Sequence, residues 1–438
     1  MTDAAIGSLP IASAPPRRDI GLRRRYAAER RFRWYGLAAI SVGLIFLVVM
    51  LASIIGKGYT SFLQTSILLP ITFDAQVIDP QDRRDTDPSV LVKANYPQLA
   101  RDALAQKLGI ALDDKPQIAA LRGFVSDGVR TQLRDMVVAD PSLIGTTRDV
   151  WVLAGANLDS AFKGQIDLEV AEGNRKVSDR QIGWMDQLRA EGAMAGKFNT
   201  GLFTYGASSR PETSGMGVAI IGSLYMMAIV LLLALPIGVA ASIYLEEFAK
   251  KTRLTDIIEV NINNLAAVPS IVFGLLGLAV FINFLGLPRS AALVGGLVLT
   301  LMTLPTIIIA TRAALAAVPP SIRSAALGLG ASKTQTVFQH VLPLATPGIL
   351  TGTIIGLARA LGETAPLLLI GMVAFVADYP KTPLDPATAL PVQIYMWANE
   401  AERAFVERMS GAIIILLVFL MAMNITAIVL RRRFERRW

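Results

Sequence analysis

Six long apolar stretches constrain this chain more than any other feature of its sequence. The first, residues 34–56, holds no charged residue. It is longer than the roughly 7–15-residue apolar region of a signal peptide, so we expect an uncleaved membrane anchor. The other five cover residues 215–245, 257–285, 290–311, 341–377 and 409–430. Because about 20 apolar residues in a helix cross the hydrocarbon core of a bilayer, the sequence predicts an all-α integral membrane protein with six transmembrane helices.

Basic residues beside these stretches predict the orientation of the chain. Arginines precede the first stretch and follow the last: Arg23, Arg24, Arg25, Arg30, Arg31, Arg33, Arg431, Arg432, Arg433, Arg436 and Arg437. Segments rich in Arg and Lys stay in the cytoplasm. We therefore expect a multi-pass protein of a bacterial inner membrane, with a basic tail over residues 1–33 and both termini cytoplasmic. The net charge of +8 then reflects membrane orientation, and nucleic-acid binding is not expected.

Residues 57–211 have the composition of a soluble α+β domain, inserted between the first two membrane helices. Alternation and propensity predict strands near 69–78, 149–153 and 197–205, and helices over 98–108, 118–137 and 178–190. With a cytoplasmic N-terminus, one span places this insert outside the cytoplasm. It contains neither His nor Cys, so a docking or spacer domain is favoured over a catalytic one. We also expect it to be separable from the membrane core over residues 212–438.

A polar loop over residues 319–343 connects two of the apolar stretches, on the predicted cytoplasmic side. Its residues predict two short helices. Ser321 can cap the first helix, Gly328 and Gly330 can end it, and Ser332 with Gln335 forms a capping box for the second. A pair of capped helices at this position indicates that another protein binds the loop.

Several chemistries are excluded by the residues themselves. The segment 328–334 superficially resembles a phosphate-binding loop, but that motif requires Gly directly before its Lys, where this chain has Ser332. Nucleotide binding by this chain is therefore rejected. The chain has no cysteine, which excludes disulfides and thiolate metal sites. We predict no catalytic residue, no metal site and no cofactor.

Arg359 and Glu363 interrupt an apolar stretch and are the candidate residues of a polar path. Each charge at bilayer depth costs about 2.5–3.5 kcal/mol, so such residues pair with each other or line a path. Their spacing of four predicts that they share one helix face. A guanidinium can hold an oxyanion, and a neighbouring carboxylate would keep the anion from being trapped. A purely structural ion pair is the alternative.

The loop also carries a resemblance to a known family. Ser324-Ala325-Ala326, Gly330 and Leu342-Pro343 have the spacing of the cytoplasmic "EAA" loop of ABC-importer permeases, although Ser324 replaces an acid and His340 an aliphatic residue. The resemblance implies that the first short helix sits in a groove of a separate ATP-binding subunit. The implied coupling residues are Ser321, Arg323, Ser324, Ala325, Ala326 and Gly330.

Further motifs resemble the permease subunits of phosphate ABC importers, the PstA type. They lie at residues 234–241, 243–247, 263–274 and 359–366, so the resemblance covers the chain from about residue 210 onward. It implies a non-enzymatic permease for phosphate, with ATP and Mg on a PstB-like ATPase subunit. It also implies a second, PstC-like permease, a PstS-like extracytoplasmic binding protein and contact with membrane lipid. The insert looks like an addition found in one branch of this family.

Two alternatives stay open from the sequence. The first is a permease for another oxyanion, such as sulfate or molybdate. The second is a membrane-anchored receptor or sensor with the insert as its input domain, which would require a cytoplasmic signalling domain. Only a short tail, residues 431–438, follows the last apolar stretch, and this favours the permease.

Overall fold

The computed structural model describes residues 22–84 and 86–434. The chain divides into two units, residues 1–53 and 54–438. The segment that we expect to be disordered, residues 1–20, lies outside the described residues, as do the last tail arginines, Arg436 and Arg437.

The described part of the first unit is a single helix. Helix α1 spans Leu22–Gly58, so the basic residues 23–33 are helical and continuous with the predicted span. None of the residues in the most apolar part of α1 is buried within this chain. An exposed apolar helix of this length is typical of a segment that lies in lipid or against another protein.

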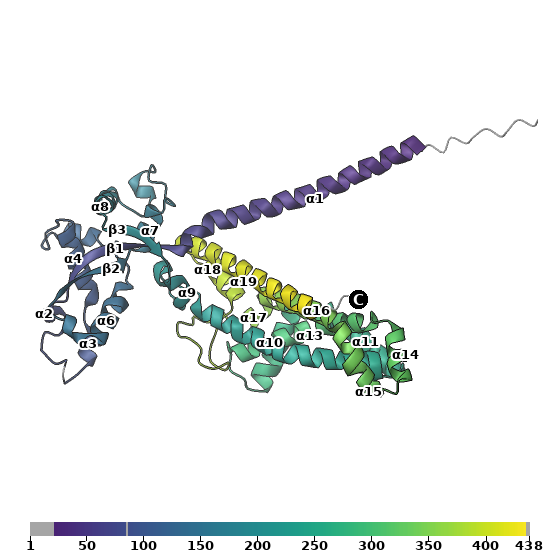
Figure 1. Cartoon of the computed structure of the whole chain (residues 1–438). Coiled ribbons are helices and arrows are strands. Elements are labelled where there is room, and N and C mark those ends of the chain that lie inside the picture. Colours follow the sequence, from purple (N-terminus) through teal and green to yellow (C-terminus); the bar gives the residue numbers. More distant parts are fainter. Residues whose placement is uncertain (1–21, 85, 435–438) are drawn as a thin grey trace, which may run out of the picture. The chain divides into compact units, whose positions relative to one another are not determined.

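A three-stranded antiparallel sheet forms the centre of the insert (Figure 1). The strands are β1 (Leu63–Thr72), β2 (Thr147–Leu153) and β3 (Met194–Phe198), in the order β2-β1-β3. The register pairs Ile67 of the central strand with Val152 on one side and Met194 on the other. Ile67, Leu69 and Ile71 alternate along β1 and are fully buried, as expected for side chains on one face of a strand.

Helices complete the insert and bury the sheet. They are α2 (Ala75–Ile78), α3 (Ser89–Lys93), α4 (Tyr96–Lys107), α5 (Lys115–Ala120), α6 (Val129–Ala139), α7 (Ala156–Phe162), α8 (Asp179–Ala190) and α9 (Gly201–Thr204). Leu104, Leu133 and Leu188 contribute one buried side chain each from α4, α6 and α8 to a common core with the strands. The insert therefore has its own hydrophobic core and mixes strands with helices.

Three of the expected elements of the insert are wrong in their bounds. The strand expected at 69–78 ends at Thr72, because Asp74 accepts a hydrogen bond from the Gln76 amide and starts helix α2 instead. The helix expected over 118–137 is two helices, separated by Gly123 with its positive φ of 77°. The strand expected at 197–205 ends at Phe198, and helix α9 follows it.

The permease core consists of helices. Its long helices are α10 (Gly217–Ile243), α13 (Ala292–Ala316), α16 (Leu342–Gly362) and α19 (Ala404–Phe434). Its shorter helices are α11 (Arg253–Ala266), α12 (Ser270–Gly277), α14 (Pro320–Gly328), α15 (Lys333–Gln335), α17 (Ala365–Leu369) and α18 (Leu390–Ala398). Within the described residues, five helical segments are long and apolar enough to span a membrane.

The third predicted span is not one straight helix. Helix α11 and the helical segment Ser270–Phe284 that begins with α12 form a pair bent by 101°. Pro269 lies at the break, where a proline cannot supply the amide that would continue the helix. The six-span prediction holds only if this bent pair crosses the membrane as one span.

Helix α13 lies at the centre of the core because small residues let its neighbours approach. A Cβ atom on Gly296 of α13 would lie 2.7 Å from the Cβ of Ile229 in α10. A Cβ on Gly352 of α16 would lie 2.2 Å from that of Ala310 in α13. Gly296 and Gly352 therefore allow close helix packing on two sides of α13.

Candidate functional site

The 319–343 loop contains one free-standing short helix. Helix α14 starts at Pro320, whose fixed φ suits the first position of a helix, and no side chain caps it. Ser321 therefore lies inside the helix, and its predicted role as the cap is wrong. The helix ends at Gly328, and Gly330 has a φ of +89°. This left-handed conformation turns the chain toward the next helix.

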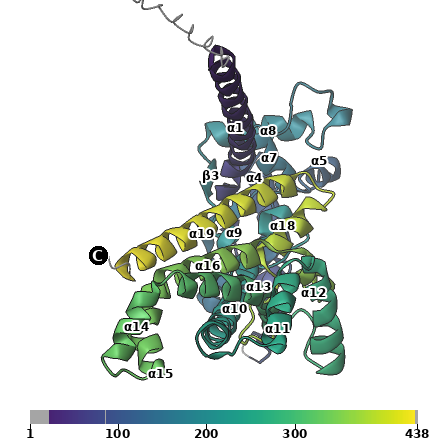
Figure 2. The same cartoon turned by 90° about the vertical axis from the view of Figure 1, so that its right-hand side faces the viewer.

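The second helix of the loop is the beginning of a membrane span. Ser332 and Gln335 form the predicted capping box, with the Gln335 amide donating to Ser332 Oγ at 3.2 Å. Helix α15 then continues through a wider π-helical turn, Thr336–Val341, into α16. The sequence predicted two separate short helices in this loop. That prediction is wrong for the second helix, which continues into α16. Figures 1 and 2 both show α14 and α15 next to each other.

The outward side of α14 carries small and apolar residues. Ser324 and Ala325 are exposed, whereas Ala326 is buried against the core. Leu327 is also exposed, and Leu329 is 90% exposed. Large aliphatic side chains in water are unfavourable. The side chains of α14 and the turn after it therefore form a surface suited to contact with another protein.

Arg323 holds this loop to the end of α10. Its guanidinium donates to Glu247 Oε1 from Nε at 3.1 Å and from Nη2 at 2.7 Å. It also donates to the carbonyl oxygens of Leu315 and Val318 at 2.8 and 2.7 Å. Arg323 is thus engaged within the chain, and its position is that of a clamp between α14, α13 and the π-helical turn Tyr244–Phe248.

A second arginine makes a parallel connection. Arg312 of α13 donates to Glu259 Oε1 of α11 at 2.8 Å and lies 3.4 Å from Glu246 Oε2. Glu246 and Glu247 lie in the motif at residues 243–247, and no role was predicted for them. The sequence could have indicated this role, because two adjacent acidic residues at the end of an apolar stretch require cationic partners.

Arg359 and Glu363 approach each other at the end of α16. The Arg359 Nε lies 3.7 Å from Glu363 Oε1, and the Arg359 side chain is 43% exposed. They lie on the same side of the helix end, as predicted, because Glu363 directly follows α16 and keeps a helical φ of −77°, while its ψ of 131° ends the helix. A long, half-exposed ion pair contributes little to stability. Most of the hydrogen-bonding capacity of Arg359 is therefore open to another group.

The interruption at Glu363 lies beside the interruption at Pro269. A Cβ atom on Gly274, in the helix after Pro269, would lie 2.6 Å from the Cα of Pro366, in the helix after Glu363. Irregular backbone at membrane depth is tolerated where it is buried in protein or lines a polar cavity. The two broken helices and Arg359 therefore form the candidate path region of the core.

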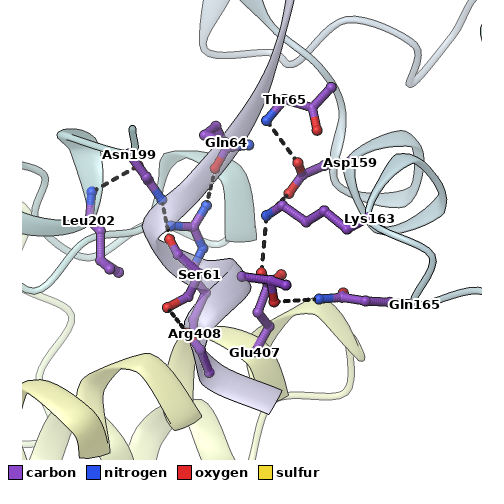
Figure 3. A network of polar contacts seen from close by, with 12 residues as sticks. Ser61, Gln64, Thr65, Asp159, Lys163, Gln165, Asn199, Leu202, Glu407 and Arg408 are labelled. Atoms are coloured by element: carbon purple, nitrogen blue, oxygen red, sulfur yellow. Dashed lines mark hydrogen bonds and ion pairs between the residues drawn. The ribbon is translucent and has the colours of Figure 1, made fainter. Parts of the chain in front are cut away.

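A buried polar network that the sequence analysis missed joins the insert to the last membrane helix (Figure 3). Lys163, which follows α7, donates to Asp159 Oδ2 at 2.8 Å and to Glu407 Oε1 of α19 at 3.0 Å. The side chains of Lys163, Asp159 and Glu407 are only 7%, 6% and 5% exposed. Asp159 Oδ1 also accepts from the amide of Thr65 in β1 at 2.9 Å. One lysine thus connects two carboxylates from separate parts of the fold.

The fully buried Arg408 continues the network on the other side of β1. Its guanidinium donates to the side-chain oxygen of Gln64. Next to it, Asn199 donates to the Ser61 carbonyl at 2.9 Å and accepts from the Leu202 amide at 3.1 Å (Figure 3). Asp159, Glu407, Lys163 and Arg408 together carry no net charge. This balance makes the burial of four ionised groups possible.

Beside this junction lies a cleft of about 540 Å³. Arg101, Arg122 and Ser126 of the insert line it together with Glu212 and Glu402. The Ser126 hydroxyl donates to Glu212 Oε1 at 2.9 Å, and burial raises the pKa of the Glu212 carboxyl. The insert therefore contacts the permease core through buried polar groups at several points. The expectation of a separable insert does not fit this packing, because its removal would leave Glu407 without Lys163.

The comparisons with known proteins agree with this architecture. Residues 234–438 match the family described as "Binding-protein-dependent transport system inner membrane component". Residues 19–172 match a domain of unknown function, DUF3333. A chain from the MetNI methionine ABC transporter matches with a TM-score of 0.40 and 18% identity, over 50% of this chain and 98% of that one. The family match over residues 234–438 gives the class of the core, a membrane component of binding-protein-dependent transporters.

Curated relatives narrow this class. The phosphate transport permease PstA 1 of Mycobacterium tuberculosis is 33% identical over 229 residues, which cover 52% of this chain and 74% of that protein. The probable ABC transporter permease YqgI of Bacillus subtilis is 34% identical over 212 residues, which cover 44% and 71%. The chain belongs to the family of PstA-like ABC-importer permeases.

We predict that Lys163→Met destabilises the protein strongly, because it leaves two buried carboxylates unpaired. Removing one partner of a buried ion pair costs about 3–5 kcal/mol. Adding Glu407→Gln should recover part of the loss, since contacting residues couple by about 0.5–3 kcal/mol. The measurement is the unfolding temperature of the purified full-length protein. Lys107→Met, which breaks the surface pair with Glu191, is the control and should change it little. Equal effects of the two lysine variants would contradict the role of the network.

We further predict that Gly330→Ala loosens the turn after α14, whereas Gly328→Ala does not. A Cβ at either position would meet no atom within 4 Å, but only Gly330 has a positive φ. A left-handed alanine costs about 1–2 kcal/mol. Hydrogen–deuterium exchange of residues 325–335 should accelerate in Gly330→Ala alone. Similar exchange in both variants would show that the left-handed conformation of Gly330 is not required.

Proposed function

We propose that this chain is a transmembrane subunit of an ATP-driven phosphate importer. The similarity to phosphate transport permeases, 33–34% identity over 229–232 residues for the mycobacterial PstA proteins, is the observation that carries the proposal. The family model matches residues 234–438, which contain both broken helices and the 319–343 loop. The chain itself would form part of the translocation path and would not hydrolyse ATP.

In this proposal α14 is the contact with a separate, PstB-like ATPase subunit. The exposed side chains of Ser324, Ala325 and Leu327, together with Leu329 beyond the helix, support it because they form an apolar surface that nothing in this chain covers within the described residues. Arg323 would act from behind this surface. Its bonds to Glu247 and to two carbonyls of α13 and its end would pass a displacement of α14 directly to α10 and α13.

The proposed importer also requires further partners. A PstC-like second permease would complete the path, and a PstS-like binding protein would deliver the anion on the extracytoplasmic side. The arginines at both ends of the chain support cytoplasmic termini in this proposal. The insert would then lie outside, with α10 separating it from the ATPase contact. Six spans result when the bent pair α11 and Ser270–Phe284 counts as one.

The test of the proposal is transport by the reconstituted complex. The chain is purified with its co-purifying subunits, inserted into liposomes and supplied with binding protein loaded with phosphate, sulfate or molybdate. We expect phosphate-loaded protein to stimulate ATP hydrolysis and phosphate uptake. Stimulation by sulfate or molybdate alone would change the substrate, and stimulation by none of them would contradict the importer function.

Arg359 is the residue we propose to contact the moving anion. If so, Arg359→Ala combined with Glu363→Ala should assemble normally but lose phosphate uptake by about tenfold or more, because a hydrogen bond to a charged group contributes roughly 1.5–3 kcal/mol. Arg359→Lys should lose less, since lysine keeps the charge but not the planar pair of donors. The measurement is uptake per assembled complex, with Lys251→Ala as an exposed cationic control. Full uptake by the double variant would leave the pair a structural role only.

A further inference from the structure

An exposed aromatic surface lies where α1 ends and the insert begins. We call it the aromatic surface and define it by Tyr59, Phe62, Leu63, Phe198 and Phe203. Tyr59, Leu63 and Phe198 are exposed, and Phe198 is 63% exposed. Large apolar side chains rarely gather in contact with water unless a partner covers them.

The five residues form one continuous surface although they come from four elements: the 3-10 helix Tyr59–Phe62, β1, β3 and α9. Phe198 stacks on Phe203 with ring centroids 6.0 Å apart, and Phe203 lies 6.2 Å from Phe62. Leu63 and Phe198 are direct cross-strand partners in β1 and β3, so they point to the same face of the sheet. Tyr59 and Phe62 are three residues apart in a 3-10 helix, whose side chains at that spacing align.

The level of this surface relative to a bilayer follows from two neighbouring helices. A Cβ atom on Gly58 would lie 2.7 Å from the carbonyl carbon of Ser410 in α19, so the two residues are at the same level. The apolar stretch of α1 ends at Lys57, and that of α19 begins after Arg408. Both charge boundaries therefore coincide beside Gly58 and Ser410. This level is the edge of the hydrocarbon core.

The distance from that edge to the aromatic surface is short. The 3-10 helix Tyr59–Phe62 rises by about 2 Å per residue, or about 8 Å in total. The headgroup layer on each side of a bilayer is about 5–8 Å thick, from a total thickness of about 40–45 Å and a core of about 30 Å. Tyr59 to Leu63 thus lie within or at the top of this layer.

We propose that the aromatic surface is a lipid-binding surface that holds the base of the insert in the headgroup layer of the membrane. Tyrosine favours this layer because its ring is apolar and its hydroxyl is polar, and Phe and Leu are among the side chains that proteins bury at the boundary between headgroups and acyl chains. The exposed Lys57 adds an ammonium group at the same level, which attracts lipid phosphates. With lipid contact here, the insert would have three attachments: α1, α19 and the membrane surface.

Depth-dependent fluorescence quenching tests the proposal in the assembled complex in liposomes. The chain has no cysteine, so Phe198→Cys and Leu63→Cys each provide one labelling site for bimane. Leu112→Cys is the matched control, an exposed leucine of the insert in the segment between α4 and α5. Spin-labelled lipids carry the quencher either near the headgroup or near the end of the acyl chain.

We expect bimane at positions 198 and 63 to emit at shorter wavelength than at position 112. The headgroup-level quencher should reduce its emission several-fold more than the acyl-end quencher, and neither should affect position 112. Emission at 198 and 63 equal to that at 112 would show a surface in water. Blue-shifted emission that neither lipid quenches would show that another subunit covers the surface. Either result overturns the proposal, whichever ion the complex transports.

Discussion

A bilayer offers no hydrogen-bond partner to a backbone amide or carbonyl, and the permease core depends on this constraint. In helices α10, α13 and α16 the backbone groups form hydrogen bonds within the helix. These helices pack closely at glycines such as Gly296 and Gly352. The two departures from it, at Pro269 and Glu363, lie beside each other, with Gly274 against Pro366. Irregular backbone at this depth requires protein or water around it. For this reason the broken helices, and not the straight ones, define where a polar solute could pass.

Ion pairs at the end of α10 turn separate helices into a connected unit. Glu246 and Glu247 receive Arg312 and Arg323, and Arg312 reaches Glu259 in α11 as well. These bonds connect α14 to the end of α10 and to α13, and through Arg312 to α11. A short helix with exposed aliphatic residues would otherwise move independently of the core. The clamp therefore gives α14 the rigidity that a transmitting contact needs, whereas its exposed face gives it the surface for a partner.

The opposite end of α10 is organised by a different electrostatic principle. There, Lys163 and Arg408 balance Asp159 and Glu407 in a buried, neutral group, which ties β1 and α7 of the insert to the start of α19. Breaking any one partner leaves an uncompensated charge, so the group holds as a unit. The insert and the last membrane helix consequently behave as one body. Any partner or lipid that binds the insert acts on α19 through these bonds.

The sequence by itself determined the features that depend on local pattern. Uninterrupted apolar stretches predicted the membrane helices, the Ser332 and Gln335 spacing predicted a capping box, and Gly330 predicted a turn, because each depends on residues close together in the chain. Local pattern also suggested helix caps and bounds that proved wrong at Ser321 and at residues 69–78. There, a neighbouring Pro320 or Asp74 starts the helix instead.

Only the tertiary structure decided which charges meet. Lys163 and Glu407 are 244 residues apart, and Arg323 and Glu247 are 76 apart, so no spacing rule joins them. The predicted single span at 257–285 is two helices bent by 101° at Pro269, and only the tertiary structure shows that the second of them packs against Pro366. Charge pairing and helix packing depend on neighbours distant in the chain, and their positions exist only once the helices have packed.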